Sequence, residues 1–479
     1  MKFYFYSFLS VLLVFSCENS SSKRGDCAYF GGEIINPSNN YITLSNTLGS
    51  KDTIYLDKRN RFIHKIDSLK PGLFSFTHGG EFQTILLEPN DSLFFRLNTN
   101  DFDESLVYTG SGSKKNNYLI RSFLDDEIEN KEFMNTSHLE PEVFVKHMNK
   151  LRKQKLAYFE EFLVNKPASD LFKSIVKSSI DYNHYAYHEM FPFGYYGNNK
   201  LIHFKDLPEG FYNYRNEVDL NNESLSELYV YNRFLFWHFN NIALKQYYSD
   251  GNHEAFDRMA LDYNIEKLRL IDSTITSEKI KNYLLKHTIR DFVLNTDDRD
   301  ATIKMIDYYL ERSSNPKDKV YLKALVAGAN KLRPGNMLSD AAIIDYSGNA
   351  IELSSLIDSP TVIYCWSTNF KMHSRNSHFK IKELKAKFPK INFVAINFND
   401  NDFHYWKKTV RSLHYPTAYE YKFSNPSEAT KKFVITFNHK IIVVDEQMEI
   451  VNSNIGLFSE EMTECLEKLT ASSKSSALK

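Results

Sequence analysis

Between Cys27 and Asn116, hydrophobic and polar residues alternate with a period of two, in short runs such as YITLSNT and FQTILLEPNDSLFFRLN. Turn-forming segments, among them Pro-Ser-Asn-Asn and Glu-Pro-Asn-Asp, separate the runs. Alternation at this period, bounded by such turns, is typical of antiparallel strands that bury one face. The pattern therefore predicts a β-sandwich over residues 26–116.

From residue 117 to residue 332 the apolar positions recur at helical spacing instead. In the segment PEVFVKHMNKLRKQKLAYFEEFL, one stripe contains Phe144, Met148, Leu151, Phe159 and Phe162. A stripe of this kind is typical of a helix that buries one face. We expect six to eight packed helices here. The carboxylates of the region are scattered and suggest no catalytic pair, although the region could still carry the main function of the protein.

From residue 336 to residue 470, strands alternate with helices. The runs TVIYCW and INFVAIN are apolar almost throughout, which suits strands that are buried on both faces, as in βαβ units. Residues 471–479, ASSKSSALK, are rich in serine and lysine and predict a disordered tail. The fold class is therefore a multi-domain α+β protein, with a β-sandwich, a helical middle region and a C-terminal α/β domain.

The first residues predict export and lipid attachment. Met1 and Lys2 precede a mostly apolar stretch, FYFYSFLSVLLVFS, which is shorter than the ~20 residues of a membrane-spanning helix. The stretch ends in Val-Phe-Ser-Cys17, which resembles a bacterial lipobox. The resemblance implies a signal peptide over residues 1–16 and a lipid anchor on Cys17, followed by a polar tether over residues 17–25. We expect a cell-envelope protein that is anchored to a bacterial membrane, on the periplasmic side of the outer membrane.

Composition and cysteine content disfavour nucleic-acid binding and a disulfide-stabilised fold. The chain has 479 residues and a formal net charge of -1, which suits several globular domains and disfavours a dedicated nucleic-acid binder. Besides Cys17 it contains only Cys27, Cys365 and Cys465, which form neither a C-x-x-C pair nor a disulfide framework. No cofactor is expected from this sequence.

Two histidines in the helical region are candidates for a metal pair. His184 and His188 are four residues apart and would share one helical face. Only Glu189 stands beside them as a further ligand, whereas metal sites need more donors. Histidines of the surface or the core are the favoured interpretation.

The N-terminal region resembles a β-rich domain of unknown function that precedes thioredoxin-like domains in envelope lipoproteins of Gram-negative bacteria. The resemblance rests on Gly32 in the first strand, on LEPNDSL at Leu87 to Leu93, and on GSGSKKN at Gly110 to Asn116.

The C-terminal region resembles the TlpA/ResA-type membrane-anchored thiol oxidoreductases over about 135 residues. Three segments carry the resemblance: DYSGNAIELSSLIDSPTVIYCWS, INFVAINFND and FVITFNHKIIVVDEQMEIV. It implies a thioredoxin-like domain over residues 336–470, with the redox turn directly after Trp366.

Both redox cysteines of that family are missing from this turn. The aligned motif W-A-T-W-C-x-x-C puts Phe370 at the attacking cysteine and His373 at the resolving one, with Lys371 and Met372 between them. The proline that faces the cysteines falls at His439, or at Asn438 if the alignment shifts by one residue. Thiol-disulfide exchange requires a thiolate, which phenylalanine does not supply.

The sequence therefore favours a binding or scaffolding protein over an enzyme. The predicted binding surface is an apolar patch around Trp366, Phe370 and the loop of His439, with an unknown protein or peptide as partner. The alternative is a thiol-disulfide oxidoreductase with a non-standard site, for which Cys365 is the nearest thiol. A metal or ligand site formed by His373 and His439 is a further hypothesis, and an ordinary surface is the default.

Overall fold

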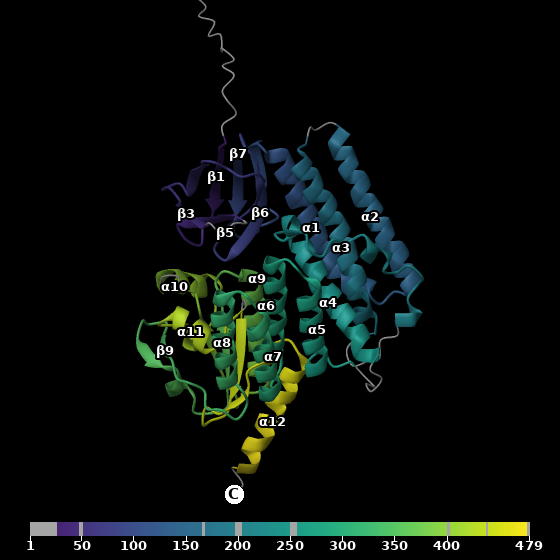
Figure 1. Ribbon diagram of the computed structural model, residues 1–479. Coiled ribbons are helices and arrows are strands. Elements are labelled where there is room, and N and C mark those ends of the chain that lie inside the picture. The colour runs from purple at the N-terminus through teal and green to yellow at the C-terminus, as the bar shows by residue number, and fades with distance from the viewer. Residues whose placement is uncertain are drawn as a thin grey trace, which may run out of the picture.

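The computed structural model describes residues 26–46, 51–164, 168–196, 204–249, 256–399, 403–436 and 439–476 (Figure 1). The predicted signal peptide, Cys17, the tether and Asn438 lie outside these residues. The described chain contains several sheets and twelve α-helices, so the mixed α+β class is confirmed. Among the described helices, none combines the length and the apolar character that crossing a membrane requires.

Eight strands near the N-terminus form two four-stranded sheets. They are β1 (Ala28–Ile35), β2 (Tyr41–Asn46), β3 (Lys51–Tyr55), β4 (Arg61–Ile66), β5 (Gly72–His78), β6 (Glu81–Leu87), β7 (Ser92–Asn98) and β8 (Val107–Ser111). The sheet orders are β4-β1-β7-β8 and β3-β2-β5-β6, and both sheets contribute to one core that contains Phe30, Phe76 and Phe95. β1 and β7 run parallel, which differs from the predicted antiparallel pairing because alternation shows burial and not strand direction.

Eight α-helices follow in the described middle of the chain (Figure 1). They are α1 (Ser113–Thr136), α2 (Pro141–Val164), α3 (Asp170–Tyr196), α4 (Tyr229–Ser249), α5 (Leu261–Thr274), α6 (Glu278–Asn295), α7 (Arg299–Arg312) and α8 (Pro316–Lys331), with short 3₁₀ turns at Phe204–Asp206, Asn213–Asn216 and Glu223–Leu225. On α2, Phe144, Met148 and Phe159 are fully or almost fully buried, as their helical spacing predicts.

Two adjacent asparagines fasten α1 to the edges of both N-terminal sheets. Asn116 accepts a hydrogen bond from Leu86 N (2.8 Å) and donates one to Leu86 O (2.9 Å) at the edge strand β6. Asn117 makes the same pair with Tyr108 N (2.9 Å) and Tyr108 O (2.8 Å) at the edge strand β8. Each side-chain amide thus takes the place of a neighbouring strand and satisfies backbone groups that an open edge leaves unpaired.

The C-terminal elements form a seven-stranded sheet in the order β10-β9-β13-β12-β11-β14-β15. The strands are β9 (Ala342–Ile344), β10 (Ala350–Glu352), β11 (Thr361–Trp366), β12 (Asn392–Asn397), β13 (Glu420–Phe423), β14 (His439–Val444) and β15 (Ile450–Asn452). The helices are α9 (Lys371–Lys387), α10 (Phe403–Ser412), α11 (Pro426–Lys432) and α12 (Glu460–Ser476), with 3₁₀ turns at Leu353–Leu356 and Thr417–Tyr419. α12 continues to Ser476, whereas the sequence predicted a disordered tail from residue 471.

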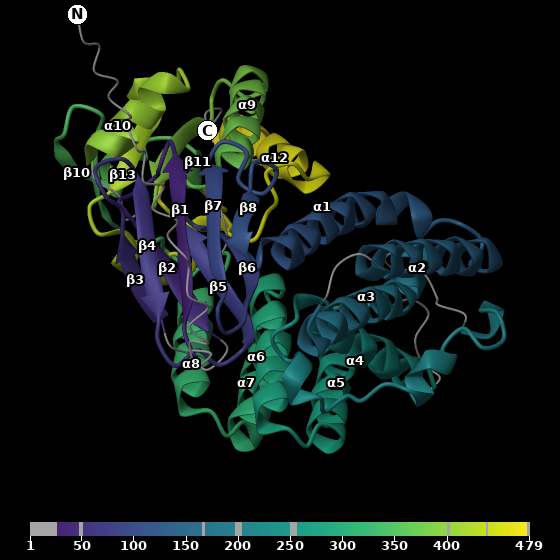
Figure 2. The same ribbon diagram turned by 90° about the horizontal axis from the view of Figure 1, so that it is seen from above.

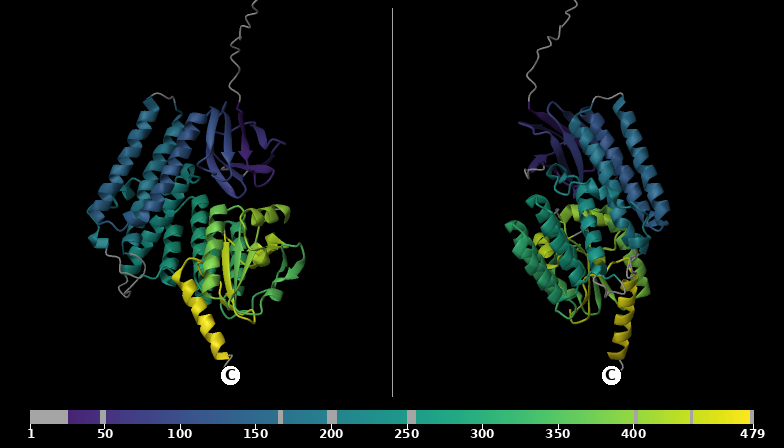
Figure 3. Two further views of the ribbon diagram at one scale, coloured as in Figure 1. Left: turned by 180° about the vertical axis from the view of Figure 1, so that it is seen from behind. Right: turned by 45° about the vertical axis from the view of Figure 1, so that its right-hand side comes forward.

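The two faces of this sheet are covered by different parts of the chain. On one face, Tyr364, Trp366 and Val443 share a core with residues of α9, α10 and α12. On the other face, Ile363, Cys365 and Ile442 belong to a core that also includes residues of α6 and α8. Figure 2 shows α6, α7 and α8 on the side of the molecule opposite α9, α10 and α12. In the view from behind, the helical region in teal again lies beside the C-terminal domain in green and yellow (Figure 3).

Candidate functional site

The turn after β11 is held by a buried polar network. Thr368 N donates to Asn399 Oδ1 (2.6 Å), and Asn399 Nδ2 donates to Ser367 Oγ (2.9 Å). Ser374 Oγ, in the first turn of α9, donates to Ser367 O (2.8 Å). Ser367, Thr368 and Asn399 are all buried. These bonds fix the backbone of the turn without any contribution from a thiol.

The residues at the redox-motif positions differ in exposure. Phe370 directly precedes α9 and is 36% exposed, whereas Met372 is 78% exposed. Lys371 is the first residue of α9. Trp366 is 0% exposed, so it cannot take part in the apolar surface patch that the sequence suggested. Of that predicted patch, only Phe370 and the neighbourhood of His439 reach the surface.

The fold brings His373 and His439 together. Their rings stack with centroids 4.4 Å apart and an interplanar angle of 26°, because His439 begins β14 directly opposite Trp366. Burial lowers the pKa of His373, and burial together with His373 and Lys440 lowers the pKa of His439 to about 4. Both imidazoles are therefore mainly neutral at pH 7.

The stacked geometry of His373 and His439 does not suit joint coordination of a metal ion. Imidazole binds a metal through a nitrogen lone pair in the ring plane, and two nearly parallel stacked rings direct those lone pairs past each other. The described residues contain no cluster of three or more His, Cys, Asp or Glu side chains suited to a metal ion. The geometry suits hydrogen bonding or stacking with a ligand better than coordination.

Cys365 lies on the opposite face of the sheet from this turn. Its side chain is 0% exposed and packs in the core shared with α6 and α8. Burial raises the pKa of its thiol to about 12, so the thiol remains protonated at neutral pH. Cys27, directly before β1, and Cys465, on α12, are also free thiols.

A buried carboxylate behind the turn was not foreseen from the sequence. Glu420, 2% exposed, accepts hydrogen bonds from Trp366 Nε1 (3.1 Å) and faces His378 Nε2 (3.1 Å). Burial raises the pKa of Glu420, and the bonds from His378 and Trp366 oppose that rise. The ring of His378 also stacks on Tyr415 with centroids 3.5 Å apart. Nothing in the local pattern around Glu420 marks it, since its partners come from two distant elements.

The N-terminal sandwich contacts the same turn. Gly80, in the hairpin between β5 and β6, lies so close to Asn369 that a Cβ at this position would be 2.9 Å from Asn369 Nδ2. Gly80 also has φ +93°, a backbone conformation that favours glycine. The hairpin thereby contacts Asn369 directly.

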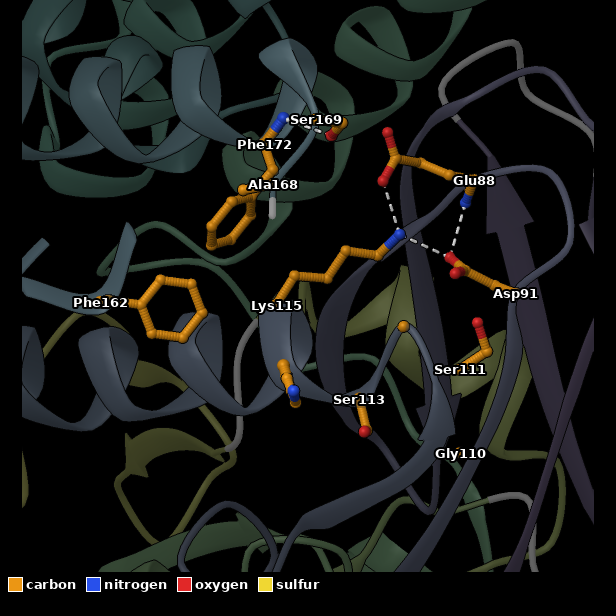
Figure 4. Close-up of a pocket in the computed structure, with 12 residues that line it drawn as sticks. Glu88, Asp91, Gly110, Ser111, Ser113, Lys115, Phe162, Ala168, Ser169 and Phe172 are labelled. Atoms are coloured by element: carbon orange, nitrogen blue, oxygen red, sulfur yellow. Dashed lines mark hydrogen bonds and ion pairs between the residues drawn. The ribbon is translucent and has the colours of Figure 1, made fainter. Parts of the chain in front are cut away.

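A second candidate site lies where the sandwich meets the helices. A cavity of about 330 Å³ is lined on one side by Glu88, Asp91 and Lys115, and on the other by Phe162 and Phe172 (Figure 4). Lys115 Nζ lies 2.6 Å from both Glu88 Oε2 and Asp91 Oδ2. The single ammonium of Lys115 therefore lies between two carboxylates at this end of the cavity.

The candidate histidines of the helical region are core residues. His184 and His188 are 8% and 3% exposed, and burial lowers their pKa values to about 2 and about 4. Glu189 does not join them as a ligand, because it is paired with Arg215 Nε (2.8 Å) and His238 Nδ1 (2.8 Å). The arrangement corresponds to a buried polar network within the helix bundle.

The C-terminal topology defines the fold class of this part of the chain. β11 and β12 are parallel and connected through α9, and β14 pairs antiparallel with β11 and leads through β15 to α12. This order agrees with the order of the thioredoxin-like segments in the sequence, and α10, β13 and α11 lie between β12 and β14. The thioredoxin-like fold is thus confirmed for this part of the chain.

Solved structures match parts of the chain at low sequence identity. Among solved structures, the chain is similar to the thioredoxin domain of a thiol-disulfide oxidoreductase from Bacteroides vulgatus, at 16% identity and a TM-score of 0.26, covering 29% of this chain and 97% of that one. It is similar to a thioredoxin-like protein from Bacteroides caccae, at 14% identity and a TM-score of 0.32, covering 43% and 77%. A thiol:disulfide interchange protein from a Bacteroides species matches at 16% identity and a TM-score of 0.26, covering 29% and 90%.

At these identities and TM-scores the likenesses carry no argument about activity, and the fold assignment rests on the strand topology. No protein-family model matches the chain, and no curated protein matches it either.

The low pKa of His439 predicts a pH-dependent stability. Below pH 6.5, the ordinary pKa of histidine, the unfolded chain binds a proton at His439 that the folded chain binds only near pH 4, so folding stability falls as the pH drops through this window. We expect His439→Gln to reduce this loss by about 2 kcal/mol between pH 7 and about pH 4, a value discounted for partial exposure. Urea unfolding followed by tryptophan fluorescence at both pH values measures the difference.

His404 on α10 provides the control, since its side chain is exposed. His404→Gln should leave the pH dependence of the wild-type protein unchanged. An equal effect of both substitutions would show that burial of His439 is not the cause.

Proposed function

We propose that this protein is a lipid-anchored component of a bacterial cell envelope, whose thioredoxin-like domain binds a partner protein or peptide and performs no disulfide exchange. The observation that carries the proposal is the absence of a thiol at the turn after β11, where Phe370 and His373 stand at the two redox positions. A nucleophilic thiolate is required for thiol-disulfide exchange, and neither side chain forms one.

The proposed binding surface lies at the mouth of this turn. It consists of the half-exposed Phe370 and the stacked, mainly neutral imidazoles of His373 and His439. The network of Ser367, Thr368 and Asn399 holds the backbone in place, so little conformational entropy is lost when a partner binds. An apolar ring beside neutral hydrogen-bonding groups suits a peptide segment with both apolar and polar contacts.

The alternative function is a thiol-disulfide oxidoreductase of the TlpA-like type with a non-standard site. Its only candidate thiol on the thioredoxin-like strands is Cys365, which would have to leave the core shared with α6 and α8 to react. Exposure of that core would cost far more than an ordinary local opening, because it separates two packed layers. The burial of Cys365 therefore favours the binding function.

The absence of redox chemistry is directly testable. The mature chain should not accelerate the reduction of insulin by dithiothreitol above the rate without protein, because the turn lacks a thiolate. Insulin precipitation measures the rate, and a thioredoxin run in parallel shows that the assay responds. Turnover that disappears in Cys365→Ser would overturn the proposal in favour of the oxidoreductase.

The binding function predicts a partner at the turn of Phe370. A photo-reactive phenylalanine analogue at position 370, introduced into the full chain in its native envelope, should give one dominant cross-linked product. The same analogue at Tyr55, which is 67% exposed on β3, is the matched control and should not give that product. Cross-linking at Phe370 that equals the control in yield and pattern would contradict a binding site at the turn.

The proposal includes an order of segments and domains along the chain. It consists of a signal peptide over residues 1–16, a lipidated Cys17 with a tether to residue 25, a sandwich domain over 26–116, a helical region over 117–332 and a thioredoxin-like domain over 336–470. The lipobox-like residues Val14 to Cys17 support the anchor. The membrane is proposed to be the outer membrane, on its periplasmic side.

Lipidation predicts that the protein incorporates radiolabelled palmitate and fractionates with membranes. Cys17→Ser should abolish the label and shift the protein out of the membrane fraction, because one cysteine thiol carries the anchor. Cys27→Ser is the matched control and should retain the label. Incorporation of palmitate into the Cys17→Ser variant would contradict the proposed anchor.

A further inference from the structure

Positive charge is concentrated on two helices of the thioredoxin-like domain. α9 contains six Lys or Arg residues and one Glu, and α10 contains three Lys or Arg residues and no acidic residue. The whole chain has 59 basic and 60 acidic residues, so this excess is local and not a property of the composition. A local excess of this kind marks a surface that attracts anions.

Four of these cations remain available to an external partner. Arg375, Lys382, Lys408 and Arg411 are exposed, and within the described chain none of them forms an ion pair. Others are engaged: Lys387 pairs with Glu467 at 3.1 Å and Lys385 lies over the ring of Tyr419. The unpaired cations lie on both helices, so the charge extends over a broad surface.

Apolar side chains project from the same surface of α9. Met372 is 78% exposed and Phe379 is 65% exposed. They are seven residues apart, which places them on one helix face two turns apart, and Arg375 and Lys382 lie beside that face. Large apolar side chains flanked by cations are typical of helices that lie on a membrane surface.

The helices α9 and α10 pack on the same face of the C-terminal sheet. Both α9 and α10 pack on the face of the sheet that carries Tyr364 and Trp366, and their outer surfaces therefore point away from α6 and α8. Figure 2 shows α9 and α10 along one side of the molecule. The cavity of about 330 Å³ is lined by residues of the sandwich and of α1 to α3, so it does not lie on this basic face. A broad face of this kind fits a planar partner better than a single peptide chain.

We propose that the basic face of α9 and α10 docks on an anionic phospholipid bilayer. Arg375, Lys382, Lys408 and Arg411 contact the headgroups, and Met372 and Phe379 insert into the interfacial region. The proposed lipid anchor on Cys17 would keep the face near a membrane. The interaction itself depends only on these helices, so its test and the test of lipidation have separate outcomes.

Vesicle co-sedimentation of the mature chain, produced without its acyl group, tests this proposal. The protein should sediment with phosphatidylcholine vesicles that contain roughly one-third phosphatidylglycerol and remain in solution with pure phosphatidylcholine. Raising the salt from about 0.1 M to about 1 M should release it, because the screening length falls from about 10 Å to about 3 Å. Each surface cation contributes about a fivefold increase in partitioning.

Arg375→Glu/Lys382→Glu should therefore lower partitioning at least about twenty-fivefold. Arg375→Lys/Lys382→Arg should retain it, and Lys58→Glu/Arg59→Glu, on the exposed turn between β3 and β4, is the matched reversal on another surface and should also retain it. Met372→Ser/Phe379→Ser should weaken binding at the lower salt concentration, because the apolar contribution is lost while the cations remain. Circular dichroism checks that each variant is folded.

The absence of binding to anionic vesicles overturns the proposal, as does binding that the α9 reversal leaves unchanged. A polyglutamate peptide is the competing probe for an acidic protein partner. If that peptide binds with the same dependence on Arg375 and Lys382 while the vesicles do not, the face recognises an acidic protein and not a membrane.

Discussion

The central constraint on this structure is that the sheet of the thioredoxin-like domain has two apolar faces. Its own helices α9, α10 and α12 cover one of them, and only the short α11 contributes to the other. All six side chains of β11 are buried, so both faces must be removed from water. The helical region provides the second cover through α6 and α8. Gly328 on α8 shows how tight this packing is, since a Cβ there would lie 2.9 Å from a methyl group of Val434. The helical region is thus a structural layer of the domain.

This shared core also decides what chemistry is available. Cys365 belongs to the face that α6 and α8 cover, and its pKa is raised for that reason. The other side of the turn is constrained by the sandwich, whose hairpin at Gly80 contacts Asn369. The sandwich is in turn fastened to α1 by Asn116 and Asn117. The sandwich therefore contacts the turn, and the helical region covers one face of the strand that leads into it, which suits a fixed binding surface better than a redox site that must open to exchange partners.

The sequence predicts those features that depend on local pattern. The apolar run TVIYCW indicated a strand buried on both faces, and the stripe of Phe144, Met148 and Phe159 indicated a buried helix face. The mixed class follows from such patterns, whereas the thioredoxin-like topology was expected from the resemblance of three segments to a known family. The parallel pairing of β1 with β7 does not, because alternation gives the same sequence in either strand direction.

The site was predictable only in part, for the same physical reason. The juxtaposition of His373 and His439 follows from aligning two motifs on a known topology. The partnership of Glu420 with Trp366 and His378, and the burial of Trp366, depend on side chains from three elements that meet only in the folded chain. No local pattern contains that information. The sequence therefore placed Trp366 in the predicted surface patch, although the folded chain buries it.

The start of α9 connects the two proposed surfaces. The N-terminus of a helix carries partial positive charge, which in a redox turn stabilises a thiolate. Here the first turn of α9 contains no acidic residue, no side chain caps it, and Phe370 precedes it. The partial charge is therefore uncompensated within the turn and adds to that of Arg375 one turn later. A partner that contacts Phe370 would bind more favourably if it carried negative charge, and the basic face of α9 begins at the same point.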